Sequence, residues 1–361
     1  MVGACFEEDL LRRIRLGRTG LLVSRIGFGG IPIQRLSEDE AIGVVRGCLD
    51  LGVDFIDTAN GYTTSEERIG KAIVGRRDQI ILASKTGARD AAGARAHLEL
   101  SLRRLQTDYL DIAQLHGVSN PDDWARVIGP GGALETLVAA RREGLVRHIG
   151  ISSHSLATAK LAVESDLFAT IQYPFNFIAD EAATELLPLA KQHDVGFIAM
   201  KPMGGGLIPN GRLAIRYLDQ FADVVPDPGI QALSEMRELV AAIDEPEPLT
   251  LADSAEIEAI RRQLGSRFCH RCEYCQPCPQ QISISTVLSI RSFLARFPLE
   301  RAFDEHTAAG VQKALSCEKC GDCEGRCPYM LPIREMLEQE SAYYLAEKAR
   351  YVAAPAAYRR G

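Results

Sequence analysis

Eight of the ten cysteines lie in two short runs toward the end of the chain, and thiolates are ligands for iron and other soft metals. The first run is C-x2-C-x2-C-x2-C, the second is C-x2-C-x2-C-x3-C, and each ends in Cys-Pro. Three thiolates two residues apart can bind one 4Fe-4S cubane from a single loop. The runs therefore predict two 4Fe-4S clusters and a protein that handles electrons. The predicted ligands are Cys269, Cys272, Cys275, Cys278, Cys317, Cys320, Cys323 and Cys327.

The second run has the spacing of bacterial ferredoxins, in which the fourth cysteine binds the neighbouring cluster. By that rule Cys278 binds the second cluster and Cys327 the first, but the first run differs by one residue, so this cross-ligation stays open. Zinc sites more often use separated C-x2-C pairs, and disulfides need an oxidising compartment, for which the N-terminal stretch shows no secretory signal. Both alternatives are disfavoured. Cys5 and Cys48 are expected to be ordinary thiols.

The rest of the composition is that of a globular protein, and 361 residues suffice for two units of unequal size. The net charge of −7 argues against non-specific nucleic-acid binding, which needs a basic surface. No apolar run approaches the roughly 18 residues of a membrane-spanning helix. Free thiolate ligands suit a reducing compartment, so we expect a cytoplasmic protein with no membrane or nucleic-acid partner.

Short apolar runs alternate with helical periodicity through most of the chain before the cysteines. Eight strands, each followed by a helix, predict a (β/α)8 TIM barrel. The alternative is a doubly wound sheet, but no G-x-G-x-x-G follows the first strand. The predicted strands are 25–28, 55–57, 80–84, 109–115, 148–151, 170–172, 196–200 and 222–225. The predicted helices are 38–51, 65–74, 92–105, 133–143, 156–165, 181–193, 213–220 and 234–243.

Further elements flank this pattern on both sides. A hairpin over 14–24 is expected to close the floor of the barrel, and the acidic, proline-rich stretch 244–250 marks a boundary. Asp253 is expected to cap a helix over 253–264. Segments 282–297 and 301–315 have helical periodicity, as does a final helix over 332–351. The predicted organisation is a barrel at 1–243, a linker and helix at 244–265, and a mainly α-helical, ferredoxin-like iron–sulfur domain at 266–361.

Four polar residues come at the carboxyl ends of predicted strands, where a barrel places its chemistry. Asp57 and Tyr62 follow the second strand, Lys85 follows the third and His116 follows the fourth. In order and setting they resemble the catalytic tetrad of the aldo-keto reductases. The segments 16–24 and 149–153 resemble that family too, and the likeness covers roughly residues 14–240. With the cysteine runs, the chain resembles the branch of this family that carries a C-terminal ferredoxin-like domain.

The resemblance implies carbonyl reduction or alcohol oxidation. A phenol is a weak acid at neutral pH, but a nearby ammonium favours the phenolate and lowers the phenol pKa. Lys85 would therefore acidify Tyr62, Asp57 would pair with Lys85, and His116 would orient the substrate oxygen. Tyr62 would deliver the proton, and a nicotinamide would supply the hydride.

The family also implies where a nicotinamide is held. A Ser, an Asn and a Gln bind its carboxamide and a Tyr stacks on its ring; in this chain Ser153 stands at the Asn position and Met200 at the Tyr position. Backbone N–H groups of a glycine-rich loop suit a diphosphate. The predicted contacts are Ser152, Ser153, Gln172, Met200, Lys201, Gly204, Gly205 and Gly206. The family's grip on the 2′-phosphate has no clean counterpart at 228–231, where Arg237 is the nearby cation, so NADP(H) is expected by analogy and NAD(H) is the alternative.

Two functions remain open from the sequence. The favoured one is an oxidoreductase for a small-molecule carbonyl or alcohol, whose clusters relay electrons to an external electron-transfer protein, act structurally or sense oxidants. The other is an electron-transfer protein whose barrel is a docking or ligand-binding module, which the altered Asn and Tyr positions motivate. A hydride carries two electrons whereas each cluster accepts one, and no flavin motif is visible.

Overall fold

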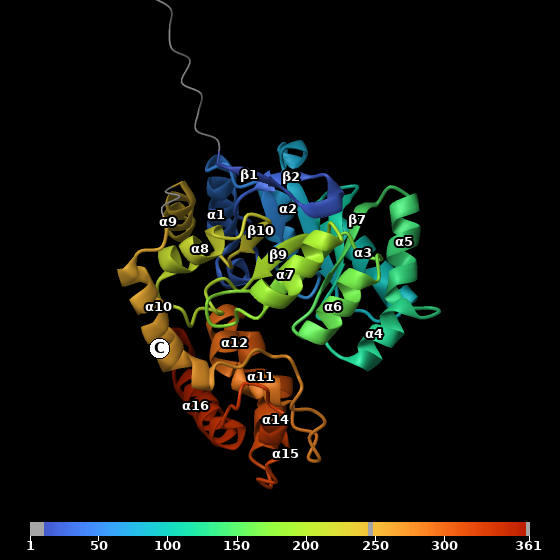
Figure 1. The fold of residues 1–361 in the computed structure, drawn as a ribbon. Helices are drawn as coiled ribbons and strands as arrows, with labels where there is room; N and C mark the ends of the chain where they lie inside the picture. Colours follow the sequence, from blue (N-terminus) through green and yellow to red (C-terminus); the bar gives the residue numbers. More distant parts are fainter. Residues whose placement is uncertain (1–10, 245–247, 359–361) are drawn as a thin grey trace, which may run out of the picture.

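The centre of the chain is a parallel β-barrel (Figure 1). The computed structural model describes residues 11–244 and 248–358, so Cys5 and part of the predicted linker lie outside the described residues. Neighbouring strands pair in parallel in the order β10-β9-β8-β7-β6-β5-β4-β3, which confirms the predicted TIM barrel. The strands are β3 (Phe28–Gly29), β4 (Phe55–Asp57), β5 (Ile81–Thr86), β6 (Leu110–Leu115), β7 (Val146–Ser152), β8 (Thr170–Pro174), β9 (Gly196–Met200) and β10 (Val224–Asp227).

The barrel closes where β3 meets the chain that follows β10. Gly29 and Gly229 form a parallel bridge, and the Gly29 N–H donates to the Pro228 carbonyl at 2.8 Å. A Cβ on Gly29 would lie 2.8 Å from that same oxygen, so the seam requires glycine. β3 begins later than the predicted 25–28, because the Arg25 N–H donates to Arg12 O and joins this segment to the hairpin instead.

Helices surround the barrel, and each predicted helix is found within two residues of its expected ends. They are α1 (Glu38–Asp50), α2 (Ser65–Ala72), α3 (Ala91–Leu105), α5 (Ala133–Arg142), α6 (Leu156–Glu164), α7 (Ala182–Gln192), α8 (Gly211–Asp219) and α9 (Leu233–Asp244). The sequence reading missed α4 (Pro121–Ile128), whose N-cap Asn120 accepts a hydrogen bond from the Asp123 N–H.

The predicted hairpin is present as β1 (Arg13–Arg15) and β2 (Leu22–Ser24). Leu16 and Val23 are buried with residues from inside the barrel, so the hairpin closes its amino-terminal end. After the predicted linker, α10 (Leu251–Leu264) packs against the barrel. Its N-cap is Thr250 and not Asp253 as predicted, because Asp253 is the third helical residue of a capping box and accepts from the Thr250 N–H.

The cysteine-rich region that follows is mainly α-helical, as predicted. Each predicted helix between the two cysteine runs is split in two, the first at Ser289 and the second at Asp304, which caps the following helix. Within the described residues, no helix is long and apolar enough to cross a membrane. The helices are α11 (Ile284–Leu288), α12 (Ile290–Arg296), α13 (Leu299–Ala302), α14 (Glu305–Ala314), α15 (Asp322–Gly325) and α16 (Ile333–Ala353).

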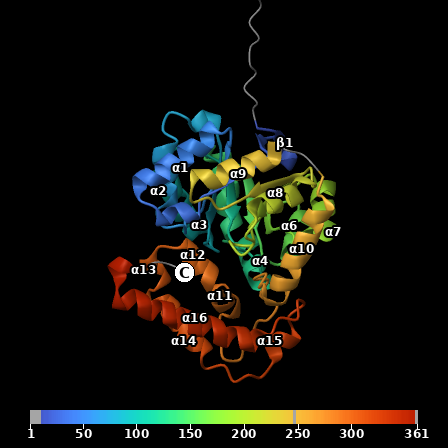
Figure 2. The same cartoon turned by 90° about the vertical axis from the view of Figure 1, so that its left-hand side faces the viewer.

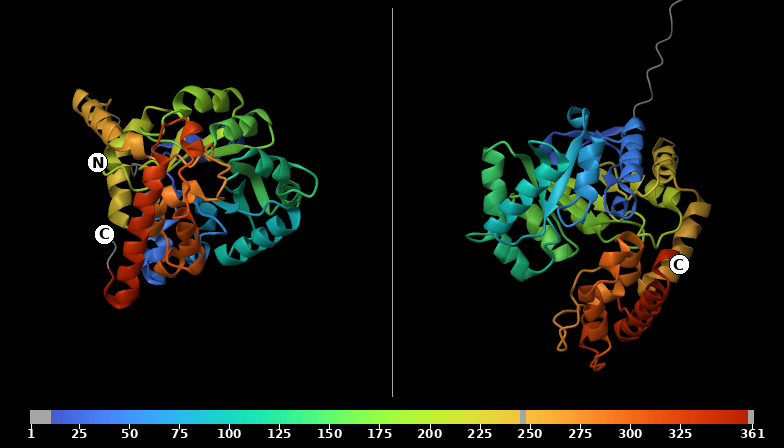
Figure 3. Two further views of the ribbon diagram at one scale, coloured as in Figure 1. Left: turned by 90° about the horizontal axis from the view of Figure 1, so that it is seen from below. Right: turned by 180° about the vertical axis from the view of Figure 1, so that it is seen from behind.

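The cysteine-rich region lies across the end of the barrel opposite the hairpin (Figures 2 and 3). A half-buried carboxylate, Glu181, joins the two parts: it accepts from the hydroxyls of Tyr173 in β8 (3.0 Å) and Tyr329 beside the second cysteine run (3.2 Å). Its Oε1 also lies 3.5 Å from Nδ1 of His270, which follows Cys269. The rings of His270 and Tyr329 stack with centroids 3.6 Å apart. Both cysteine runs are therefore fastened to the barrel through one side chain.

Replacing Glu181 by Ala should weaken this attachment, because the hydroxyls of Tyr173 and Tyr329 would both lose their acceptor. We expect a loss of about 2–3 kcal/mol in the free energy of unfolding, since hydrogen bonds to charged groups are each worth about 1.5–3 kcal/mol. Anaerobic denaturant titration of the full chain measures this loss. Glu185→Ala on the same helix is the control, because its surface pair with Lys160 should contribute less than about 1 kcal/mol. An equal loss in the free energy of unfolding for Glu181→Ala and Glu185→Ala would contradict the role of Glu181 in joining the two parts.

Candidate functional site

A cavity of about 1220 Å³ lies between the carboxyl ends of the barrel strands and the cysteine-rich region. All four predicted catalytic residues, Asp57, Tyr62, Lys85 and His116, line it. This is the end at which barrels carry their chemistry, because the loops that follow the strands converge there. Phe268, Cys269 and other residues of the cysteine-rich region line the opposite wall. The cavity is thus built by both parts of the chain.

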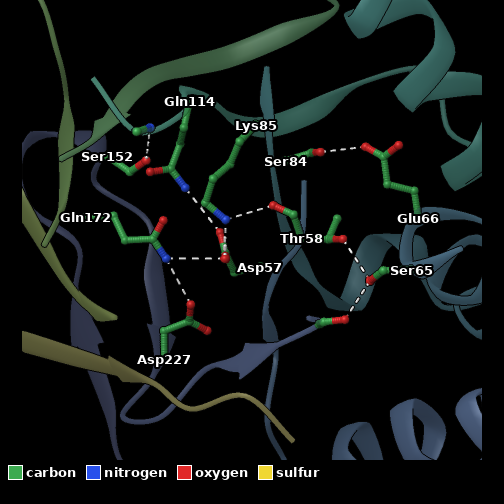
Figure 4. A network of polar contacts seen from close by, with 12 residues as sticks. Asp57, Thr58, Ser65, Glu66, Ser84, Lys85, Gln114, Ser152, Gln172 and Asp227 are labelled. Atoms are coloured by element: carbon green, nitrogen blue, oxygen red, sulfur yellow. Dashed lines mark hydrogen bonds and ion pairs between the residues drawn. The ribbon is translucent and has the colours of Figure 1, made fainter. Parts of the chain in front are cut away.

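Asp57 and Lys85 form a buried ion pair on neighbouring strands (Figure 4). Lys85 Nζ donates to Asp57 Oδ2 and to the Thr58 carbonyl at 2.8 Å. Gln114 Nε2 donates to the other Asp57 oxygen at 3.1 Å. Burial disfavours the charge of Lys85, but Asp57, Tyr62 and Asp227 together outweigh this effect and the pKa of Lys85 is raised. Lys85 is therefore charged and held in place, as the sequence led us to expect.

Tyr62 and His116 face each other edge to plane, with ring centroids 5.7 Å apart, and Lys85 Nζ lies 5.5 Å from the Tyr62 centroid. Burial raises the pKa of Tyr62, while Lys85 and Arg296 lower it without reversing the shift. The pKa of Tyr62 is thus raised and not lowered as the sequence led us to expect. The free-energy cost of burying a phenolate exceeds the stabilisation that the Lys85 ammonium provides. Burial and the charges of Lys85 and Arg89 lower the pKa of His116 to about 3, so its ring is neutral at pH 7.

Asp227, which the sequence reading missed, completes this buried group (Figure 4). It is the last residue of β10 and is 6% exposed. Gln172 Nε2 donates to Asp227 Oδ2 at 2.9 Å and to Asp57 Oδ2 at 3.2 Å, while Asp227 Oδ1 has no partner among the described residues. Burial and the nearby charge of Asp57 raise the pKa of Asp227 well above its usual range. Two carboxyl groups thus lie near one ammonium, which is paired with Asp57.

Asp227 could have been found by the rule that already identified Asp57, Lys85 and His116. In a barrel, catalytic residues lie at the carboxyl ends of the strands. The predicted last strand stopped at residue 225, two residues short of the observed end. Asp227 also lies between Pro226 and Pro228, a pattern typical of a turn.

Seven of the eight predicted cofactor contacts line the cavity. They are Ser152, Gln172, Met200, Lys201, Gly204, Gly205 and Gly206. Ser153 does not line it: its hydroxyl accepts from the Ser155 N–H and donates to the Ser155 carbonyl, both at 3.1 Å, in a turn before α6. His154 lines the cavity instead.

Two details bear on a bound dinucleotide. Gln172 Oε1 is buried and has no partner among the described residues, so it can accept from a ligand amide. In the glycine loop, the N–H groups of Gly204 and Gly206 already donate to Lys201 O and Met203 O. At the start of α9, Glu235 accepts from the Gln231 and Ala232 N–H groups, so a carboxylate already covers these donors.

The cysteines from the two runs are interleaved. A small hollow is lined by Cys278 from the first run together with Cys317, Cys320 and Cys323 from the second. Burial raises the pKa of Cys269 and raises the pKa of Cys272 to about 11. The charge of Cys327 contributes to both shifts, so Cys327 lies beside the first run. This is the arrangement that ferredoxin cross-ligation requires, with Cys278 among the second run and Cys327 beside the first.

Among the residues that the structure describes, no three His, Cys, Asp or Glu side chains form a group that could hold one metal ion. A cubane is larger than a single ion, so its ligands surround a wider space. The four-cysteine hollow has that form.

Comparison with known proteins agrees with this architecture. The Aldo/keto reductase family model matches residues 25–260 and a 4Fe-4S dicluster domain matches residues 268–332. The chain therefore belongs to the aldo/keto reductase family and carries a 4Fe-4S dicluster domain after its barrel.

Individual relatives match the barrel part. The uncharacterized oxidoreductase YqkF of Bacillus subtilis is 29% identical over 238 residues, covering 62% of this chain and 74% of YqkF. The aldo-keto reductase YhdN of Bacillus subtilis is 34% identical over 225 residues, covering 57% and 66%. Among solved structures, aldo-keto reductase AKR11C1 from Bacillus halodurans has 28% identity and a TM-score of 0.59, covering 69% of this chain and 96% of its own. An aldo/keto reductase from Klebsiella pneumoniae in complex with NADP and acetate has 27% identity and a TM-score of 0.57, covering 70% and 96%.

Proposed function

We propose that this chain is an oxidoreductase that reduces a small-molecule carbonyl, or oxidises the corresponding alcohol, with a nicotinamide cofactor in the barrel and two 4Fe-4S clusters beside it. The observation that carries this proposal is the convergence of Asp57, Tyr62, Lys85 and His116 on one cavity. Family membership supports the reaction class. The catalytic assignment of each residue is part of the proposal.

Each of these residues has a distinct part in the reaction. Tyr62, whose pKa is raised by burial, carries its proton at neutral pH and can donate it to a carbonyl oxygen. The positive charge of Lys85 favours the phenolate that remains, and Asp57 holds Lys85 in place. The neutral ring of His116 can donate a hydrogen bond to the same oxygen without adding charge.

A nicotinamide, when bound, supplies or accepts the hydride. The free oxygen of Gln172 would accept from its carboxamide, and Met200 and Lys201 would border it. The neighbour from Klebsiella pneumoniae, described with NADP, favours NADP(H). Two carboxylates of α9, Glu235 and Glu238, line the cavity. They favour NAD(H), because the 2′-phosphate of NADP(H) would bring further negative charge toward them.

Parallel titration of NADPH and NADH into anaerobically purified protein tests the function and chooses between the two cofactors. We expect quenching of protein fluorescence and oxidation of the cofactor with a panel of aldehydes and quinones. The same sample should contain about eight iron atoms per chain if two cubanes are present. No binding and no turnover, in protein whose clusters still exchange electrons with a ferredoxin, would contradict the enzyme.

That last outcome would favour the second candidate, an electron-transfer protein. One observation supports an electron-transfer role in either case: Cys269 lines the cavity, whereas Cys320 is exposed on the cysteine-rich region. The two sets of thiols therefore extend from the cavity toward the surface. Clusters in these positions would connect a cavity ligand with an external redox partner.

Asp227→Asn should move the alkaline limb of the pH profile of kcat/KM to lower pH. When ionised, Asp227 raises the pKa of both Tyr62 and Lys85, and asparagine cannot supply that charge. Both groups would then lose their protons at lower pH than in the wild type. Steady-state rates across the alkaline range measure the shift, and a limb that stays in place would exclude Asp227 from this group.

A further inference from the structure

Five arginines border the cavity, and only three of them have carboxylate partners. The three pairs are Arg89 with Asp123, Arg267 with Glu335 and Arg291 with Glu340. For Arg271 and Arg296, no carboxylate within the described ranges 11–244 and 248–358 lies within ion-pair distance. Both come from the cysteine-rich region: Arg271 lies in the loop between Cys269 and Cys272, and Arg296 ends α12. The region thus presents to the barrel two arginines that have no carboxylate partner in the part of the chain that the structure describes.

Arg296 is held in position by the glycine loop that follows β9. Ser292, one turn earlier in α12, donates to the Gly205 carbonyl at 3.1 Å. A Cβ on Gly205 would lie 2.6 Å from the Arg296 guanidinium, so glycine makes room for this arginine. Lys201, from the same loop, lies with its Nζ 3.4 Å from His154 Nδ1 and adds a third basic group.

These basic groups line the same cavity as Tyr62 and His116. Burial, followed by the charges of Arg271 and Arg296, lowers the pKa of Lys201 well below its usual value. Arg271 also contributes to the lowered pKa of His116, and Arg296 acts on Tyr62. Arg271 and Arg296 line one cavity, so an anion bound there can accept charge-assisted hydrogen bonds from both.

The diphosphate of the cofactor is the rival for this anion. Two of the three N–H groups of the glycine loop, those of Gly204 and Gly206, are already used within the loop. Arg296 also acts on Tyr62 and Arg271 on His116, the two residues proposed to hydrogen-bond the reacting oxygen. An anionic group on the substrate itself therefore fits the charge distribution better.

We propose, on the basis of the proposed function, that the substrate is a carbonyl compound that carries a carboxylate or a phosphate. Arg271 and Arg296 bind this anionic group, while Tyr62 and His116 hydrogen-bond to the carbonyl oxygen. The cysteine-rich region then has a part in substrate selection as well as in holding clusters.

Calorimetry on the anaerobic full-length protein, without nicotinamide, tests this with two matched pairs of aldehydes. One pair is 4-carboxybenzaldehyde and its neutral methyl ester; the other is glyceraldehyde 3-phosphate and glyceraldehyde. We expect the anionic member of at least one pair to bind at least about tenfold more tightly, as a charged hydrogen bond is worth that much. The pair that shows the preference identifies the anion as carboxylate or phosphate.

Arg296→Gln should abolish the preference, whereas Arg291→Gln, on the same helix but paired with Glu340, should keep it. Iron content of each variant controls for loss of the clusters. If the preference depends on Arg296 but no aldehyde is reduced with either nicotinamide, the anion site stands and the proposed function fails. Equal affinity within both pairs would overturn the anion site. The anion site would also be overturned if the Arg296→Gln variant bound NADH and NADPH more weakly but still preferred the anionic aldehyde. Arg296 would then bind the cofactor and not the substrate.

Discussion

Tyr62→Phe should lower carbonyl turnover by about 10²–10⁴-fold, the usual contribution of a positioned proton donor. The substitution removes only the hydroxyl, so the ring contact with His116 and the Asp57–Lys85 pair should remain. Nicotinamide affinity, measured by fluorescence titration, should change little. The loss should appear mainly in kcat, because the proton is transferred in the transition state and not on binding.

Tyr109→Phe is the matched control. That ring lies between the guanidinium groups of Arg77 and Arg147, away from the cavity. Its turnover should stay within about twofold of the wild type, as expected for a residue outside the catalytic group. Unchanged turnover in Tyr62→Phe would remove the proton-donor assignment, and an equal fall in both variants would point to a general structural effect.

Double replacement of the cysteines should reveal which thiols share a cluster. If Cys278 and Cys320 bind the same cubane, each single Ala variant loses about four of about eight irons, and the double variant loses no more. Combining Cys278→Ala with Cys272→Ala should remove both clusters. Iron and sulfide analysis of anaerobic samples measures these losses.

The same variants should weaken the cysteine-rich region, since thiolate–iron bonds help to hold so small a core together. Ile282 and Leu337 pack around these cysteines, so losing a cluster exposes apolar surface as well. Additive losses from Cys278 and Cys320 would instead assign each run its own cluster. Full iron content in Cys320→Ala would exclude this cysteine as a ligand.

The fold and most of the site were predictable because their signals are local. Strand and helix periodicity placed the barrel, and Asp57, Lys85 and His116 followed from the ends of the strands. The cysteine spacings likewise indicated the clusters without any knowledge of tertiary structure. Ser153 was placed at a cofactor position by resemblance to the family, and only the structure shows that its hydroxyl is hydrogen-bonded within its own turn.

The missed features depend on packing between segments far apart in the chain. Arg296 meets the barrel only because α12 lies against Gly205, a contact with no sequence signature. The pKa of Tyr62 was expected to fall, but burial, which depends on tertiary packing, raises it. Asp227 was lost through a two-residue error in one strand end, a small local fault with a large chemical consequence.

The shared wall between the two parts of the chain also bears on how long such an enzyme survives in air. Cys269 belongs both to the cavity and to the first set of thiols, and Phe268 and Arg271 beside it line the same wall. Oxygen damage to a cubane at this position would release the loop that carries these side chains and open the reaction chamber to water. If the proposed function holds, loss of the cluster to oxygen would therefore also impair the catalytic residues in the barrel.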